Sequence, residues 1–201
     1  MPFPVLHAFA GYSIYTLSKN KQERNWKLAF YCIFLANAAD LDYIPGIIIG
    51  KAGHFHHGIT HSFGVALLVG LLAALGAGLW KKRSAMKSFL ISFSAYASHI
   101  ILDLSNGHCK GMPLFWPLSS RHYTTHFKID YLEGAKSVEN ADLAGFIHHL
   151  TSGVCIKRFV LEVIFVSSVW LLIFIRNELK KSKVVPHPFL NVLQGKPISN
   201  K

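Results

Sequence analysis

The sequence predicts an all-α fold: a polytopic membrane bundle of four to five spanning helices with an outward-facing, partly helical loop region. Of the 201 residues, 51% are hydrophobic and only 15% are charged, whereas about 25% are charged in a typical soluble domain. The apolar residues gather in runs that approach the roughly 20 residues needed to cross a bilayer. This composition excludes a disordered chain, and it disfavours a soluble globular domain.

Four apolar runs approach the length of a spanning helix: 28–49, 63–80, 86–104 and 159–175. The first of them is interrupted by three helix-breaking or charged residues, Asp40, Asp42 and Pro45. A fifth segment, 3–17, is apolar but short, and it either crosses the membrane or lies against the other runs.

The basic residues predict the orientation of these runs. The segments 18–27 and 81–87, with the tail from residue 176, hold 14 of the 21 Lys and Arg residues. With five spans these segments all fall on one side, which the positive-inside rule makes cytoplasmic. The N-terminus and the stretches 50–62 and 105–158 then face outward.

We therefore expect one membrane-embedded domain over residues 1–180, with 105–158 as its extramembrane loop region, and a basic cytoplasmic tail over 181–201. A net charge of +11 on a soluble domain would suggest nucleic acid. Here membrane topology explains the charge, so no nucleic-acid partner is expected. Within the loop region, residues 138–150 have the apolar spacing of a short amphipathic helix.

The ionisable residues of the apolar runs form the candidate site. Such residues are costly inside a membrane and usually functional. In the predicted topology they all lie at or near the outward end of a helix, in one layer: His7, Asp40, Asp42, His56, His61, His99 and Asp103.

Two pairs within this set could each take part in binding a cation. His99 and Asp103 lie one helical turn apart on one face, where they can chelate a cation, although such a pair is often only hydrogen-bonded. Asp40 and Asp42 are expensive to bury without a partner. That partner is either the histidines, through a metal, or Arg121, and a structural ion pair is the alternative.

The segment from His56 to Ser62 reads His-His-Gly-Ile-Thr-His-Ser. Its imidazoles suit a turn leading into the run 63–80. Thr60 or Ser62 would cap that helix or, with His57, support a ligand from behind. The alternative is a solvated His-rich loop.

Taken together, these elements resemble the membrane-bound metal-dependent hydrolases of the YdjM type, described as LexA-regulated proteins of the bacterial inner membrane. The resemblance covers residues 1–125 and includes the segment from Gly111 to Leu118, Gly-Met-Pro-Leu-Phe-Trp-Pro-Leu. One departure is His57, where the family usually has Arg, so that phosphate binding at this position is in doubt. A looser similarity links the ligand order to zinc-dependent phospholipase C and single-strand nucleases.

The resemblance implies a hydrolase with one to three divalent ions, zinc first and manganese or iron next, acting on a lipid or other amphiphilic phosphoester at the outer face of the membrane. The expected metal ligands are His7, Asp42, His56, His61, His99 and Asp103. Asp40 or Asp42 would accept the proton of the attacking water, and Arg121 would bind the substrate.

Two other functions stay open: a transporter coupled to ions or protons, since intramembrane His and Asp also mark ion paths, and a non-catalytic protein with a structural metal.

Oligomerisation is possible, because Gly70, Ala74 and Gly78 would allow close helix packing. A disulfide between Cys109 and Cys155 would require an oxidising compartment.

Overall fold

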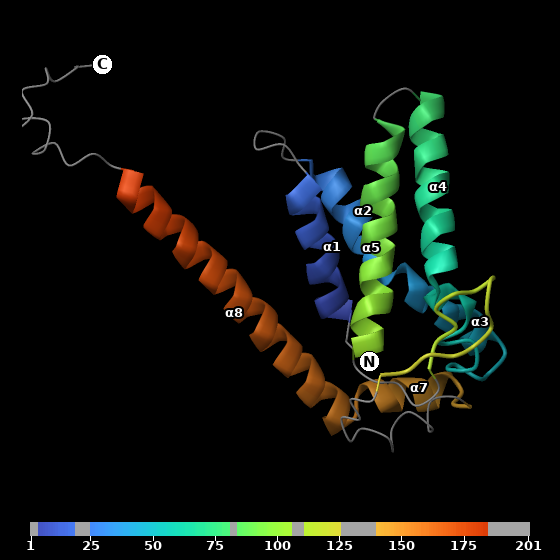
Figure 1. Ribbon diagram of the computed structural model, residues 1–201. Helices are drawn as coiled ribbons and strands as arrows, with labels where there is room; N and C mark the ends of the chain where they lie inside the picture. The colour runs from blue at the N-terminus through green and yellow to red at the C-terminus, as the bar shows by residue number, and fades with distance from the viewer. Residues whose placement is uncertain (1–3, 19–24, 81–83, 106–110, 126–139, 185–201) are drawn as a thin grey trace, which may run out of the picture. The chain divides into compact units, whose positions relative to one another are not determined.

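The computed structural model describes residues 4–18, 25–80, 84–105, 111–125 and 140–184 (Figure 1). The chain divides into two compact units, Met1–Val163 and Ile164–Lys201, and each is treated by itself below. The regular secondary structure of the described residues is helical; they contain no β-strand, only one isolated antiparallel bridge between Met112 and Tyr123. The predicted all-α fold is therefore confirmed for this part of the chain.

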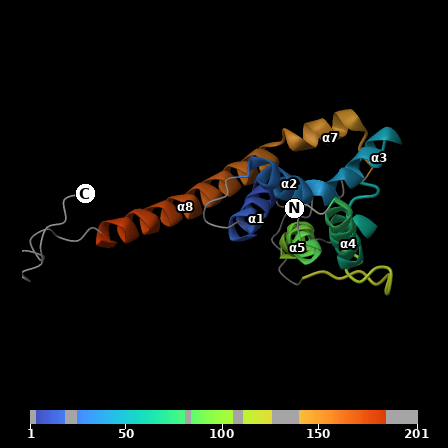
Figure 2. The same cartoon turned by 90° about the horizontal axis from the view of Figure 1, so that it is seen from above.

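The bundle of the first unit is formed by α1 (Pro4–Ser18), α2 (Trp26–Asn37), α4 (Phe63–Trp80) and α5 (Ala85–Ser105). Helix α1 packs against α2 and α4 packs against α5, while α5 also contacts both α1 and α2 (Figures 1 and 2). Helix α5 is thus the central element, and its buried residues contribute to both apolar clusters of the core.

The predicted run 28–49 is not one helix, and this prediction is wrong. Helix α2 ends at Asn37 and is followed by a 3₁₀ turn, η1 (Ala38–Asp42), and by the short helix α3 (Tyr43–Ile48). The chain leaves the α-helix where Asp40 and Asp42 turn toward buried histidines. With 12 residues, α2 is about 18 Å long, shorter than a bilayer core of roughly 30 Å.

The other predicted helices are present. The run 63–80 is α4, 86–104 lies within α5, and 3–17 corresponds to α1. Helix α4 begins at a serine cap, because the Ser62 hydroxyl accepts a hydrogen bond from the amide of Val65 at 3.2 Å.

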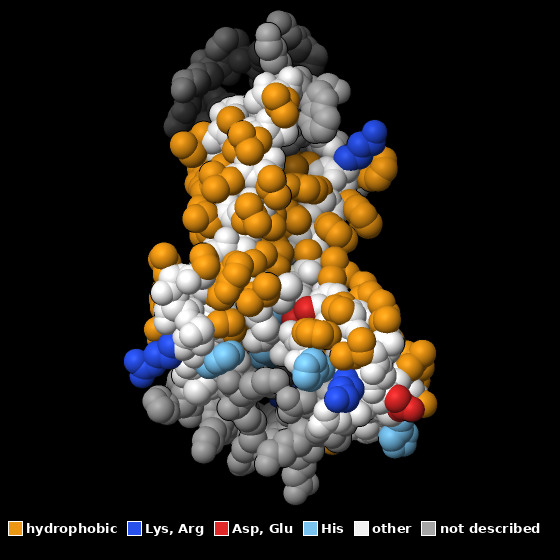
Figure 3. Space-filling view, turned by 90° about the vertical axis from the view of Figure 1, so that its right-hand side faces the viewer, with side chains coloured by type: hydrophobic (Ala, Val, Ile, Leu, Met, Phe, Trp, Pro, Cys, Tyr) orange, Lys and Arg blue, Asp and Glu red, His pale blue; other side chains and the backbone are white. Residues whose placement is uncertain are grey.

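Two described helices are long and apolar enough to cross a membrane, Ala85–Ser105 and Gly153–Arg176, and Phe63–Leu79 is a shorter apolar helix. Leucines cover the outer face of α4, with Leu72 59% and Leu79 82% exposed. Figure 3 shows a face of the molecule on which hydrophobic side chains form a broad band, with His and acidic side chains below it. Apolar surface of this extent is typical of a protein that contacts lipid.

The loop region packs against the start of α4. The amide of Phe63 donates to the carbonyl of Leu114 at 2.8 Å, and Gly64 lies so close to the Trp116 carbonyl that a Cβ would overlap it. The predicted amphipathic helix over 138–150 is observed as α7 (Leu143–Leu150), which Asp142 caps. Residues 126–139 and Cys109 lie outside the described residues, so the disulfide stays a prediction.

Helix α8 (Gly153–Val184) contains the predicted run 159–175. It begins in the first unit and continues into the second, whose described part, 164–184, consists of this helix alone. Its apolar side chains are exposed, as in Phe165 and Leu172. The domain boundary at residue 180 and the basic tail stay predictions, and 185–201 lie outside the described residues.

Candidate metal centre

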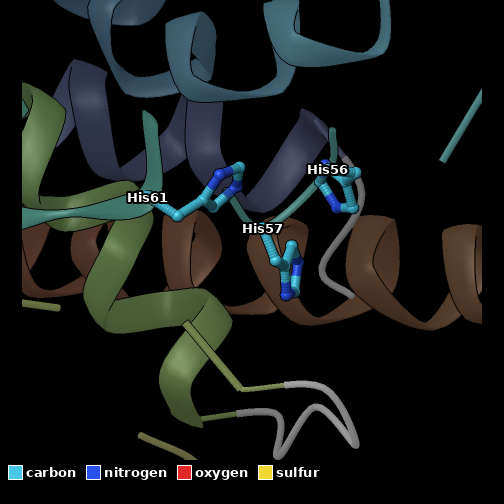
Figure 4. A group of neighbouring side chains, drawn as sticks. All are labelled: His56, His57 and His61. Carbon is cyan, nitrogen blue, oxygen red and sulfur yellow. The ribbon is translucent and has the colours of Figure 1, made fainter. Parts of the chain in front are cut away.

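Segments far apart in the sequence bring histidines and aspartates to one end of the first unit. Helix α1 supplies His7, η1 supplies Asp40 and Asp42, and α5 supplies His99 and Asp103 in its last two turns. The segment between α3 and α4 adds three buried imidazoles that lie close together, His56, His57 and His61 (Figure 4). The predicted juxtaposition of these residues in one layer is therefore observed.

Four of these side chains converge on one point: Asp40, His61, His99 and Asp103. The two Nε2 atoms lie 3.2 Å apart, and Oδ2 of Asp103 lies 3.4 Å from each of them. Oδ1 of Asp40 lies 3.4 Å from Nε2 of His99 and 3.7 Å from Nε2 of His61.

These five separations, from 3.2 to 3.7 Å, lie close to the ligand spacing of a tetrahedral metal site. Zinc binds nitrogen and oxygen at about 2.0–2.2 Å, which at tetrahedral angles separates neighbouring ligand atoms by about 3.3–3.6 Å. A charge-assisted N–H···O hydrogen bond would instead be about 2.7–2.9 Å long. We call these four residues the central tetrad.

Each imidazole of the central tetrad is oriented by an acceptor on its far nitrogen. Nδ1 of His99 lies 2.8 Å from the carbonyl oxygen of Ala36, and a carbonyl only accepts, so Nδ1 carries the proton. Nδ1 of His61 lies 3.1 Å from the Thr60 hydroxyl oxygen, whose own hydrogen is donated to Oδ2 of Asp42, and 3.2 Å from that Oδ2. Both Nε2 lone pairs are therefore available to a metal, which is how ligating histidines are usually fixed.

Carboxylates also control the protonation of His61. Burial alone would lower its pKa, but the contacts with Asp103, Asp40 and Asp42 outweigh burial and raise the pKa well above the ordinary value. Without a metal the imidazolium is therefore favoured, and a divalent ion would replace its proton.

Asp42 contacts His56 as well as His61. Its Oδ1 lies 2.9 Å from Nδ1 of His56, and its Oδ2 accepts a hydrogen bond from the Thr60 hydroxyl at 2.8 Å. The ring of Tyr43 stacks on His56 with the ring centroids 4.1 Å apart. Burial lowers the pKa of His56 despite its contact with Asp42. Asp42 was expected among the ligands, and its observed contacts suit an orienting residue.

Asp103 is surrounded by imidazoles. Besides the two of the central tetrad, Nε2 of His57 lies 3.4 Å from Oδ2, and Nε2 of His7 lies 3.5 Å from Oδ1. Within the described part of the chain, neither oxygen of Asp103 and neither nitrogen of His7 has a hydrogen-bond partner, and the same holds for Oδ1 of Asp40. Buried polar atoms without partners are costly, so this donor set fits a divalent cation.

The structure also places residues that sequence reasoning located differently or missed. His57 was expected to support a metal ligand without touching the ion, but its Nε2 contacts Asp103 directly. The backbone of His57 has a positive φ of 61°. Tyr96 was not singled out, yet its hydroxyl donates to the carbonyl of Thr60 at 2.9 Å. No sequence signal marks either feature. Arg121 is exposed, 5.8 Å above the Tyr123 ring, and its substrate role stays a prediction.

Fold and site define an all-helical membrane protein with a buried His and Asp cluster that could bind a metal ion. The family model of the YdjM inner membrane protein matches residues 1–178. The chain therefore belongs to the YdjM inner membrane protein family, which places it in a lipid bilayer. No curated protein and no solved structure matches the chain.

Proposed function

We propose that the protein is a metal-dependent hydrolase of the membrane, with zinc as its first candidate ion and manganese or iron as alternatives. One observation carries the proposal. Three members of the central tetrad, His61, His99 and Asp103, have side chains that are 0% exposed, whereas the side chain of Asp40 is 22% exposed. The Oδ1 atom of Asp40 that faces the tetrad is itself buried, so the exposed part of this side chain marks the edge of the site from which water would enter. Catalytic zinc sites have three protein ligands and keep one position open for water or substrate.

In this proposal His61, His99 and Asp103 hold the ion. A divalent ion there supplies Lewis-acid chemistry, which polarises a phosphoryl or acyl oxygen and acidifies water. Asp40 accepts the proton of the attacking water, because its Oδ1 has no hydrogen-bond partner within the described residues. Asp42 is less suited to that role, since both of its oxygens are engaged by His56 and Thr60.

The substrate that fits this location best is a lipid or another amphiphilic phosphoester. We propose four to five spans, with the basic segments in the cytoplasm and the site at the outer face of the inner membrane. Exposed apolar residues lie close to the accessible Asp40, among them Leu41 at 48% and Ile44 at 52%. Arg121 is the candidate for contact with an anionic headgroup.

A second function is favoured by the same geometry. Four protein ligands at tetrahedral spacing also suit a closed structural site, and the protein would then bind a metal without catalysis. The two functions differ in what Asp40 does.

The variant Asp40→Ala separates the two functions. We would purify wild type, Asp40→Ala and Asp142→Ala in detergent, measure bound metal by elemental mass spectrometry, and assay hydrolysis of phospholipids and phosphomonoesters. Asp142 caps α7 and serves as the matched control. Retained metal with lost hydrolysis in Asp40→Ala supports the hydrolase. Loss of the metal supports the structural site, and a wild type that binds no zinc, manganese or iron overturns both.

A further inference from the structure

Asp103 has more imidazole neighbours than one ion can use. Nitrogens of four histidines lie within 3.5 Å of its oxygens: His7, His57, His61 and His99. The central tetrad accounts for two of them, both on Oδ2. His7 is the one imidazole among these four that faces the other oxygen, Oδ1.

The contact between His7 and Oδ1 has the spacing of two metal ligands. Its 3.5 Å is longer than a charge-assisted hydrogen bond, which is about 2.7–2.9 Å, and it lies within the 3.2–3.7 Å range of the separations in the central tetrad. Both residues are buried, with His7 0% and Asp103 1% exposed. In the described chain none of the four polar atoms of these side chains has a hydrogen-bond partner. Stacking of His7 on His99, with centroids 3.9 Å apart, fixes its ring plane.

The charge of the site points the same way. Three carboxylates, Asp40, Asp42 and Asp103, lie among histidines that must be neutral to ligate. One divalent ion would leave a net negative charge in a buried site, which is costly and repels an anionic substrate. A second divalent ion would make the net charge positive and attract a phosphoester.

We propose that a second divalent cation binds between Nε2 of His7 and Oδ1 of Asp103, so that the Asp103 carboxylate bridges two ions. The proposal rests on the first ion of the proposed function and narrows the substrate to phosphoesters. Ions in two-metal sites lie about 3.5–4 Å apart and together stabilise an in-line displacement at phosphorus. With two protein ligands, the second ion binds more weakly than the first and keeps positions open for water and phosphate oxygens.

Manganese titration of the metal-free, full-length protein in detergent tests the proposal. We expect two Mn²⁺ per chain in wild type, the second bound at least about tenfold more weakly, and an exchange-coupled electron paramagnetic resonance spectrum from ions about 3.5–4 Å apart. His7→Ala should keep the tight ion and lose both the second ion and the coupling. The matched control, His54→Ala, removes an exposed histidine of the segment between α3 and α4 and should bind two ions.

Each other outcome contradicts a defined statement. A single uncoupled ion in wild type overturns the second ion and leaves the proposed hydrolase standing. A His7→Ala variant that keeps two ions, or that loses both, overturns the assignment of His7. Absence of any bound Mn²⁺, Zn²⁺ or Fe²⁺ in folded wild type overturns the proposed function itself.

Discussion

The Nε2 atoms of His61 and His99 face each other at 3.2 Å, although the two residues lie on different elements. Each ring is held in this direction by its far nitrogen, through Asp42 in one case and the Ala36 carbonyl in the other. Two nitrogen lone pairs pointed at one another repel unless a proton or a cation lies between them. A proton between them would satisfy the pair in the metal-free protein, and a divalent ion would take the place of that proton.

Removing either histidine of this pair should abolish tight metal binding. We expect His99→Ala to lower the affinity for zinc by more than about 100-fold, since it removes a ligand rather than a group that orients one. A competition assay with a zinc-binding dye measures the change. His148→Ala, an exposed histidine of α7, should leave the affinity unaltered, and an equal loss in both variants would contradict the assignment.

Asp42 should tune the site without being indispensable. In Asp42→Asn the carboxylate that orients His61 and His56 becomes an amide, and we expect about 10- to 100-fold weaker metal binding. Thr60→Val removes the hydroxyl that contacts both Asp42 and Nδ1 of His61 but keeps the carboxylate, so it should have a smaller effect. The same dye competition ranks the two variants. If Asp42→Asn binds metal like wild type, its orienting role is wrong.

Metal binding should weaken as the pH falls. Contacts with carboxylates raise the pKa of His61 above its ordinary value, so a proton must leave before this nitrogen can ligate. Affinity should therefore rise with pH until His61 is neutral in the metal-free protein and then level off. Calorimetry in buffers of different ionisation enthalpy should show protons released on binding, and His61→Ala should release fewer.

Close packing of α1 against α2 leaves no room for a side chain at Gly11. A Cβ at this position of α1 would lie 2.5 Å from the Cys32 carbonyl oxygen and 2.9 Å from Cβ of Ala36, whereas a Cβ at Gly78 would meet nothing within 4 Å. Overpacking costs about 1–3 kcal/mol, so Gly11→Ala should lower the thermal unfolding midpoint in detergent. Gly78→Ala, the matched control, should leave it unchanged or raise it slightly, because alanine favours the helix.

The proposed orientation can be tested with single cysteines in a variant without native cysteines. A membrane-impermeant thiol reagent should label Lys51→Cys in intact cells and Ser84→Cys only after permeabilisation. Both positions are exposed, so accessibility within the protein does not bias the comparison. The reverse pattern would place the site on the cytoplasmic side.

The sequence predicts those parts of the fold that depend on local hydropathy. The run 63–80 is α4 with both ends correct, and α5 extends one residue beyond the prediction at each end. The end of α2 at Asn37 was not predicted, because apolar residues continue beyond it. What interrupts the helix is the contact of Asp40 and Asp42 with histidines distant in the sequence, and hydropathy does not report such contacts.

The candidate site shows the same division. The grouping of histidines and aspartates in one layer followed from topology, because each lies near the outward end of a run. The different contacts of Asp40 and Asp42 did not, since the two residues are of the same type and differ only in the partners that the fold gives them. The direction of His57 depends on a left-handed backbone conformation at φ 61°, which a non-glycine residue adopts rarely.

Helix α5 carries two members of the central tetrad within a segment long enough to cross the membrane. His61, a third member, lies instead on the segment between α3 and α4. Any change in the tilt of α5 therefore shifts one pair of ligands relative to the other ligands. Spanning helices adjust their tilt to the thickness of the surrounding bilayer. If the candidate metal centre binds an ion, we therefore expect its geometry to respond to bilayer thickness, so that acyl-chain length would act as an effector without binding to the site.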